Sequence, residues 1–211
     1  MKQIQLTDLV EIKHPSPLRS LSKRYTGEKV SEPFHIIKRQ DINEFGFIRA
    51  TETSSSVRLS ERDLNYLSSR DRFLKPYDIL ISIKYAETQP GIILDASSPK
   101  FIASPIFTIL RTRDQQLREE LSFSIFSFFH SKNGEEVFHD IRNIPVGRRS
   151  LLSRVLIPVL EGDERKTLVN NVKQQIQKCK EIEKIKMEID QIREKNGFIM
   201  SGNDKKQQYG A

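Results

Sequence analysis

The sequence predicts a mixed α/β body followed by one long C-terminal helix of the coiled-coil type. Short β-branched runs separated by polar loops predict the strands of the body, and two segments with apolar residues at helical spacing predict its helices. The long helix is predicted by the absence of Gly and Pro from Asp163 to Asn196. We therefore divide the chain into a domain at 1–160, a helix at 161–196 and a polar tail at 197–211 that is expected to be disordered.

The first third of the body is predicted to begin with a short helix at 6–12, with Thr7 as its N-cap. This helix should end before His14-Pro15, because a residue that precedes Pro avoids helical geometry. The stretch 18–33 is polar and basic without a period, which is typical of a loop. Two runs of residues that favour β-strands predict strands at 34–38 and 46–50. The Ser/Thr-rich run that follows predicts a loop at 51–56.

The strongest strand prediction in the rest of the body is 78–83, a β-branched run that follows Pro76. Aromatic and aliphatic residues at helical spacing predict helices at 117–129 and 135–141. Shorter apolar runs and the basic sequence Gly-Arg-Arg-Ser predict the remaining elements, which are strands at 92–94, 106–110 and 155–158 and a turn at 147–150.

Apolar residues recur along the long helix at a mean step of about 3.4 residues, close to the 3.5 of a coiled coil. At about 1.5 Å per residue, the helix would reach on the order of 50 Å, which is longer than a body of this size. We call this apolar stripe the seam and expect it to pack against a partner helix. The seam consists of Leu168, Val172, Ile176, Cys179, Ile182, Ile185, Ile189 and Ile192.

The composition favours a polyanionic partner. The 211 residues include 35 Lys and Arg against 28 Asp and Glu, which gives a net charge of +7. A basic balance of this kind is typical of many nucleic-acid-binding proteins. The single cysteine excludes an internal disulfide framework and fits the reducing cytoplasm. No apolar run is long enough to span a membrane, so we expect no membrane partner.

The motifs of common enzymes are missing from the sequence. It has no Gly-rich phosphate loop, no Gly-x-Ser-x-Gly elbow and no Asn/Asp-Pro-Pro-Tyr/Phe loop of an adenine methyltransferase. The four histidines lack metal-ligand spacing, and Glu164-x-Lys166, which has a nuclease-like spacing, opens a helix whose positive N-terminal end suits acidic residues. We therefore expect no catalytic residues, no metal site and no cofactor.

Basic residues gather in the predicted loops together with small hydroxyl residues. Arg and Lys neutralise phosphates, whereas Arg, Gln and Ser also reach base edges in the major groove. This mixture indicates a surface that reads double-stranded DNA. The candidate DNA-binding residues are Arg19, Lys23, Arg24, Ser54, Ser55, Ser56, Arg58, Arg62, Lys84, Tyr85, Arg148 and Arg149.

In its order of motifs, the chain resembles the specificity (S) subunits of type I restriction-modification systems, in a half-length form. The run Leu74–Leu80 is similar to the Leu-Lys-x-Gly-Asp-Ile-Leu of that family, with Tyr77 in place of Gly. The strand that ends in Leu110-Arg111 and the exit Val155–Pro158 have counterparts there. The Glu-Gln-x-x-Ile that opens the family's spacer helix is also similar to a run in this chain, which has Arg165 in place of Gln.

The resemblance implies a target-recognition domain with one spacer helix and no catalysis of its own. Such a subunit would direct a methyltransferase (M) subunit, which uses S-adenosylmethionine, to its DNA target, and an endonuclease (R) subunit is a further partner that the resemblance allows. Full-length members carry two recognition domains and two helices in an antiparallel coiled coil. The seam would therefore pair two copies of this chain as a homodimer, which would favour an interrupted palindrome in DNA.

Three other functions remain open at this level. A coiled-coil adaptor that binds a protein explains the helix but leaves the loop arginines unexplained. A mimic of a specificity subunit that binds the methyltransferase and competes for it has the same sequence features. A compact nuclease would need a metal site that the sequence does not contain.

Overall fold

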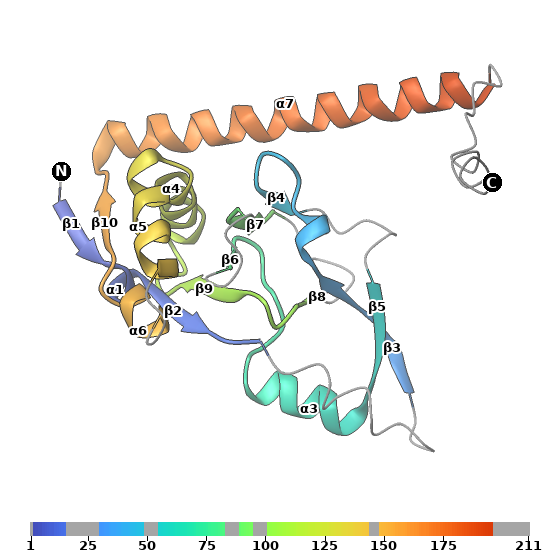
Figure 1. Ribbon diagram of the computed structural model, residues 1–211, viewed down its shortest axis with the longest axis horizontal. Helices are drawn as coiled ribbons and strands as arrows, with labels where there is room; N and C mark the ends of the chain where they lie inside the picture. The colour runs from blue at the N-terminus through green and yellow to red at the C-terminus, as the bar shows by residue number, and fades with distance from the viewer. Residues whose placement is uncertain are drawn as a thin grey trace, which may run out of the picture. The chain divides into compact units, whose positions relative to one another are not determined.

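The computed structural model describes residues 2–15, 30–48, 55–82, 89–94, 101–143 and 148–195. The chain divides into two compact units, Met1–Asn170 and Asn171–Ala211. The first unit contains three β-sheets and the helices between their strands, and the second contains most of the long helix (Figure 1). The mixed α/β class with a long C-terminal helix is therefore confirmed.

The larger sheet has five strands in the order β2-β9-β6-β7-β4. Neighbouring strands are antiparallel except for β7 and β4, which run parallel. Every residue of β6, β7, β9 and β4 is buried, as the apolar runs of the sequence lead one to expect. The strands are β2 (Val10–Lys13), β4 (Phe47–Ile48), β6 (Ile79–Ile81), β7 (Gly91–Ile93) and β9 (Thr108–Thr112).

A second sheet has three strands in the order β5-β3-β8, formed by β5 (Ser55–Ser60), β3 (Val30–Ile37) and β8 (Phe101–Ala103). Side chains alternate along β8, so that Phe101 and Ala103 join one apolar cluster and Ile102 joins another. The first cluster also takes in Leu80 and Ile109 of the larger sheet. The two sheets therefore share a core.

The other elements complete the first unit. A two-stranded sheet pairs β1 (Lys2–Gln5) with β10 (Leu156–Val159), and α1 (Leu6–Leu9) follows β1. The helix α4 is buried around most of its circumference, which fits its lack of a polar face. The remaining helices are η1 (Arg39–Asp41), α3 (Glu61–Ser69), α4 (Arg118–Phe129), α5 (Lys132–Asn143), α6 (Arg148–Leu152) and α7 (Gly162–Lys195).

His130, at the C-terminal end of α4, connects this helix to the larger sheet. Its Nε2 lies 3.0 Å from the carbonyl oxygen of Pro90, and its ring packs on Phe126. Gly46 lies close to the His130 ring, because a Cβ at position 46 would be 2.6 Å from Nε2 of His130. The φ of Gly46 is 79°, a left-handed value that Gly adopts without strain. Burial lowers the pKa of His130, against the effects of the Pro90 carbonyl and of Glu135. His130 thus has a packing role at the end of α4.

Several sequence predictions of local structure are wrong. The helix predicted at 6–12 ends at Leu9, and the following four residues form β2, because pairing with β9 buries Val10. Gln5, and not Thr7, occupies the N-cap. The loop predicted at 51–56 gives way to β5 from Ser55 onward, and α6 begins inside the predicted turn at 147–150.

Other predictions of helices and strands are confirmed or fall outside the described residues. The predicted strands at 34–38, 46–50, 78–83, 92–94, 106–110 and 155–158 correspond to β3, β4, β6, β7, β9 and β10. The predicted helices at 117–129, 135–141 and 161–196 correspond to α4, α5 and α7. The sequence did not predict β1, β8 or α3. The tail at 197–211 and most of the loop at 18–33 lie outside the described residues.

Candidate nucleic-acid interface

The structure describes only part of the predicted DNA-binding set. Arg62 lies on α3 with its side chain exposed. For five residues the structure describes the backbone alone, and it places Ser55, Ser56 and Arg58 in β5 and Arg148 and Arg149 in α6. The other six, Arg19, Lys23, Arg24, Ser54, Lys84 and Tyr85, lie outside the described residues.

The helix α3 has one apolar face and one polar face. Leu67 is buried, and with the partly buried Leu64 it packs in the core cluster of the three-stranded sheet. Because 3.6 residues make one helical turn, the opposite face presents residues at steps of three, four and seven. These exposed residues are Arg62, Asn65, Tyr66 and Ser69, followed directly by Arg70. We call these five residues the α3 outer face.

Two contacts order the α3 outer face. The guanidinium carbon of Arg70 lies 5.5 Å from the centre of the Tyr66 ring, in the arrangement of a cation–π pair. The hydroxyl of Ser69 donates a hydrogen bond to the carbonyl oxygen of Tyr66 at 3.0 Å. The side chains of Arg62 and Asn65 therefore extend from a regular helix, and the guanidinium of Arg70 is held against the Tyr66 ring.

The C-terminal end of α3 is closed by a Schellman motif. The amide of Arg72 donates to the carbonyl of Leu67 at 2.9 Å, and the amide of Asp71 donates to that of Ser68 at 3.0 Å. Asp71 takes the left-handed backbone that this motif requires, with a φ of 48°. Gly is the usual residue there, although Asp adopts this conformation more readily than most other residues. The helix end is thus fixed at a residue that carries a negative charge.

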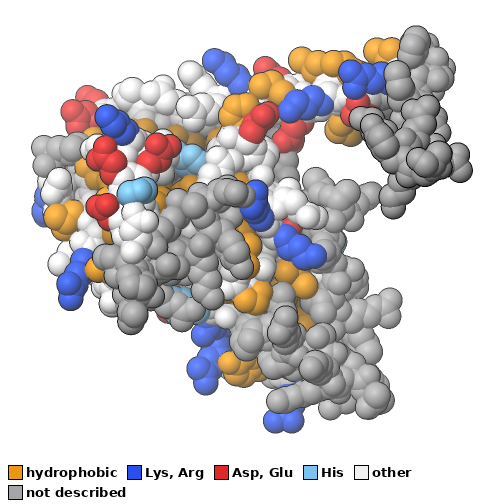
Figure 2. All heavy atoms as spheres, in the orientation of Figure 1, with side chains coloured by type: hydrophobic (Ala, Val, Ile, Leu, Met, Phe, Trp, Pro, Cys, Tyr) orange, Lys and Arg blue, Asp and Glu red, His pale blue; other side chains and the backbone are white. Residues whose placement is uncertain are grey.

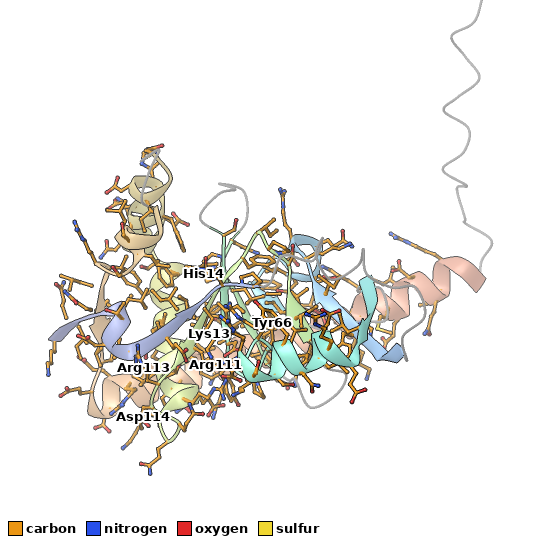
Figure 3. The ribbon with its side chains drawn as sticks, turned by 90° about the horizontal axis from the view of Figure 1, so that it is seen from below. Lys13, His14, Tyr66, Arg111, Arg113 and Asp114 are labelled. Atoms are coloured by element: carbon orange, nitrogen blue, oxygen red, sulfur yellow. The ribbon has the colours of Figure 1, made fainter. Side chains whose placement is uncertain are left out.

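The Asp71 carboxylate lies in a cluster of six charged residues, which we call the anchor cluster. Lys13 of β2 and Lys75 each approach it to 2.8 Å, and Arg111 of β9 reaches its Oδ2 as well. Arg111 also donates to the backbone carbonyls of Asp71 and Phe73, at 3.1 and 2.7 Å. Lys13, Arg111 and Tyr66 are labelled in Figure 3 on β2, β9 and α3. The anchor cluster consists of Lys13, Asp71, Lys75, Asp78, Arg111 and Arg118.

Asp78 is the buried centre of the anchor cluster, with no exposed surface. Its two carboxylate oxygens accept from Nε and NH2 of Arg111 at 2.9 and 2.6 Å, and Arg118 of α4 donates at 3.1 Å. The amide of Lys75 donates to it at 2.9 Å. A fully buried carboxylate needs such partners, because an uncompensated charge is costly to desolvate. The anchor cluster therefore joins the end of α3 to β2, β9, the approach to β6 and α4.

Hydrogen bonds set the charge state of Asp71. Burial alone would raise the pKa of this carboxyl group, but the bonds from Lys13 and Lys75 and the charge of Arg111 outweigh burial and hold the pKa well below its usual value. Asp71 is therefore ionised throughout the neutral range. Four cations face two carboxylates in the anchor cluster, and Glu11 adds a further acidic group 3.2 Å from Lys13.

Tyr77 stands where the resembled motif has Gly, and its backbone explains why Gly is usual there. Its φ is 66°, a left-handed value that costs a bulky residue free energy. Its ring meets that of Phe123 edge to face at 5.7 Å, and its hydroxyl donates to Glu119 at 2.9 Å. Burial and the neighbouring Glu119 raise the pKa of Tyr77. These contacts with α4 hold the side chain in place against the backbone strain.

Arg165, which replaces a Gln of the resembled motif, also has a defined partner. Its Nε lies 3.4 Å from a carboxylate oxygen of Glu120 in α4. This ion pair fixes the first turn of α7 to the body within the unit that ends at Asn170.

Charge is unevenly distributed over the body. Figure 2 shows Lys and Arg side chains in the region where Figure 1 places α3, whereas acidic side chains gather in the region of α5. Glu135, Glu136 and Asp140 of α5 are exposed there. A polyanion would approach the α3 region more readily than the α5 region.

Sequence reasoning missed most of the α3 outer face. Of its five residues, Arg62 alone belongs to the candidate DNA-binding set predicted from the sequence. The signal was present: Leu64 and Leu67 at a step of three, with Ser60 and two acidic residues before them, indicate a short amphipathic helix. Asp78 and Arg111 were noted as parts of separate motifs, and their pairing was missed.

The described residues contain neither a candidate metal site nor a membrane-spanning helix. No group of three or more His, Cys, Asp or Glu side chains within the described ranges is arranged to hold a metal ion. None of the described helices is both long enough and apolar enough to cross a lipid bilayer.

Comparison with known proteins gives a likeness of fold. No protein-family model matches the chain, and no curated protein matches it. The HsdS subunit from Thermoanaerobacter tengcongensis is 17% identical over 87% of this chain and 39% of its own, with a TM-score of 0.49. A chain from a structure of the type I R-M system, described for complex assembly and conformational transition, is 15% identical over 92% of this chain and 43% of its own, with a TM-score of 0.50.

At this level of identity the likeness concerns the fold. The chain spans less than half the length of either structure. Over 92% of this chain, the fold is similar to that of a chain from the structure of the type I R-M system. The resemblance drawn from the motifs is confirmed at the level of the fold.

Proposed function

We propose that this chain is a sequence-specific DNA-recognition subunit of a type I-like restriction-modification system, without catalysis of its own. The observation that carries the proposal is the fold, which matches a chain of such a system over 92% of the present sequence. The net charge of +7 and the cationic α3 outer face, anchored to the rest of the body, support it. A surface of this kind neutralises phosphates and offers side chains that distinguish bases.

The proposal extends to the partners. A DNA-reading subunit acts by placing an enzyme on its target, and we propose a methyltransferase subunit that uses S-adenosylmethionine as that enzyme, with an endonuclease subunit as a further partner. The exposed acidic side chains of α5 lie in a different region from α3 in Figures 1 and 2, so a protein partner and DNA have separate surfaces available. A reducing cytoplasm is the compartment that suits the single cysteine.

We further propose that α7 pairs with the α7 of a second copy. Four isoleucines of the seam, Ile182, Ile185, Ile189 and Ile192, are 38 to 57% exposed. A row of large apolar side chains along a 34-residue helix is unfavourable in water unless a partner covers it. Their spacing near 3.5 is that of helices which pack in a coiled coil. A symmetric pair would hold two recognition domains at a fixed separation on DNA.

Selection from a random duplex DNA library tests the proposal. The purified chain is used at about 0.15 M salt, where non-specific phosphate contacts are weakened. Enrichment of a two-part motif with a fixed gap supports both DNA reading and pairing of two copies, and a single half-site supports DNA reading alone. Failure to enrich any motif, also with a co-purified methyltransferase subunit, would contradict DNA reading and favour the adaptor or the mimic.

A further inference from the structure

We infer that the α3 outer face is the base-reading surface of the recognition domain and that α3 enters the major groove of DNA. In this arrangement Asn65, Ser69 and Arg62 face the base edges, and Arg70, stacked on Tyr66, lies against the phosphate backbone. The inference rests on the proposed function and deepens it, since it assigns the recognition to one helix.

The first argument is the size and exposure of the helix. With nine residues, α3 is about 14 Å long, and with its side chains an α-helix is about 10 to 12 Å wide. The major groove of B-DNA is about 12 Å wide and admits one helix. The buried side of α3 rests on the three-stranded sheet through Leu64 and Leu67, so its opposite side is free to face a groove.

The second argument is the chemistry of the exposed stripe. Arg62, Asn65 and Ser69 are spaced by three and four residues and therefore lie along one line of the helix. Asn pairs bidentately with adenine N6 and N7, Arg pairs with guanine O6 and N7, and Ser bonds to either. Short amide, hydroxyl and guanidinium groups in one row allow contacts with successive base pairs.

The third argument is the flank of the same face. Tyr66 and Arg70 follow Arg62 at steps of four and so lie beside the reading row. The Tyr66 ring holds the Arg70 guanidinium at 5.5 Å, which reduces the freedom that Arg70 would lose on contacting a phosphate. The exposed Glu61 stands in the first turn, where a negative charge is favourable to the helix dipole.

The fourth argument is rigidity. A side chain reads a base well only if its support holds it within a fraction of an ångström. The Schellman end of α3 and the ion pairs of Asp71 with Lys13, Lys75 and Arg111 tie this helix to the buried strands of the body. Arg62, the member of the candidate DNA-binding set whose side chain lies in the described part of the chain, is on this anchored helix.

The test uses the full chain and the DNA motif obtained by library selection. Affinities are measured for the selected duplex, for every single base-pair variant of it and for an unrelated duplex, at about 0.15 M salt. We expect Asn65→Ala to weaken binding to the selected duplex by roughly 10- to 100-fold, to abolish the preference at one A·T pair and to leave binding to the unrelated duplex unchanged. Arg70→Ala should weaken binding to all duplexes alike and reduce the salt slope by about 1.

Matched controls separate reading from folding. Ser68→Ala lies on α3 outside the reading row, and Asn143→Ala is an exposed amide at the end of α5; both should keep the wild-type motif and affinity within about twofold. A second readout replaces the adenine of the affected pair by 7-deazaadenine, which lacks the N7 acceptor. Wild type should then lose affinity, whereas Asn65→Ala should be insensitive to the change.

The outcomes distinguish this inference from the proposed function. If wild type selects a motif but Asn65→Ala and Arg62→Ala keep the same motif and affinity, α3 is not the reading helix, and the proposed function stands. If wild type selects no motif, the proposed function fails and this inference fails with it.

Discussion

At the scale of single residues, the pairing of Asp78 with Arg111 determines how the body is held together. Asp78 is fully buried and the Arg111 side chain is 5% exposed, and their chain neighbours Ile79 and Leu110 pair across β6 and β9. Two hydrogen bonds at 2.9 and 2.6 Å satisfy both carboxylate oxygens. Because Arg111 also contacts Asp71 and the carbonyl of Phe73, the same guanidinium fixes the segment that follows α3.

The first prediction concerns this guanidinium. Arg111→Met keeps an unbranched side chain but leaves the buried charge of Asp78 without its main partner, so the free energy of unfolding should fall by about 3 to 5 kcal/mol. Arg113→Met, two residues further along and exposed, should cost less than about 1 kcal/mol. Urea unfolding followed by circular dichroism measures both. Equal, small losses for the two variants would show that the anchor cluster does not hold the body together.

The second prediction concerns the pH dependence that Asp71 causes. Its pKa in the folded protein lies below that of the unfolded chain, which is about 3.9, so its contribution to stability is fully present above that pH. As the pH falls further, the unfolded chain binds the proton first, and the contribution is lost on the way to the folded pKa. Asp71→Asn should therefore be less stable than wild type at pH 7, with a shallower loss of stability below about pH 4.5.

The control for this pH dependence is Asp140→Asn, which changes an exposed carboxylate of α5. Unfolding free energies from urea titrations between pH 7 and pH 2.5 should give the same slope for this variant as for wild type. A wild-type slope in Asp71→Asn would contradict the assigned role of the carboxylate.

At the scale of elements, the sequence predicted the helices and strands that have a clear periodicity or a long apolar run. The buried strands β6, β7 and β9 and the helices α4, α5 and α7 were identified because their patterns are long or strongly apolar. The short helix at 6–12 was predicted wrongly beyond Leu9, since pairing of Val10–Lys13 with β9 decides its conformation. Such pairing depends on residues about a hundred positions away, which local patterns do not contain.

The candidate site was less accessible to sequence reasoning than the fold. Arg62 was predicted from residue type, but the α3 outer face depends on which side of a nine-residue helix packs on the three-stranded sheet. The anchor cluster joins residues that lie between positions 13 and 118 of the sequence. The charge of a residue alone does not indicate with which oppositely charged residue it forms an ion pair. Tyr77 was seen only as a departure from a motif, and its left-handed backbone needed the structure.

The third prediction belongs to α7. If the seam pairs two copies, wild type should sediment at twice the chain mass of 24.5 kDa at concentrations of tens of micromolar. Ile185→Asp should shift the protein to monomer, because it places a charge in the paired apolar seam. Met187→Asp is the matched control, since Met187 is 64% exposed and lies outside the seam. A wild-type monomer in analytical ultracentrifugation would contradict self-pairing and leave a partner's helix as the occupant of the seam.

At the scale of the whole molecule, the chain combines a mixed α/β body with a long helix whose row of isoleucines is exposed, and its net charge is +7. Each of the two compact units has its own task in the proposal: residues up to Asn170 read the DNA, and the residues beyond join copies. Two copies related by a two-fold axis would read two half-sites in opposite orientation, and the helix pair would set the gap between them. The length of that gap should change when whole heptads are added to or removed from α7.

The central claim is that this fold recognises a DNA sequence, and the most direct measurement is a ratio of two affinities. The full chain is titrated with the duplex obtained by selection and with a scrambled duplex of equal length and composition, at about 0.15 M salt. We predict that the selected duplex binds at least about 1000-fold more tightly, the lower end of the range for specific DNA-binding proteins. A ratio near one, with both affinities falling steeply and equally as salt rises, would mean that the basic surface binds polyanions without reading them, and it would contradict the claim.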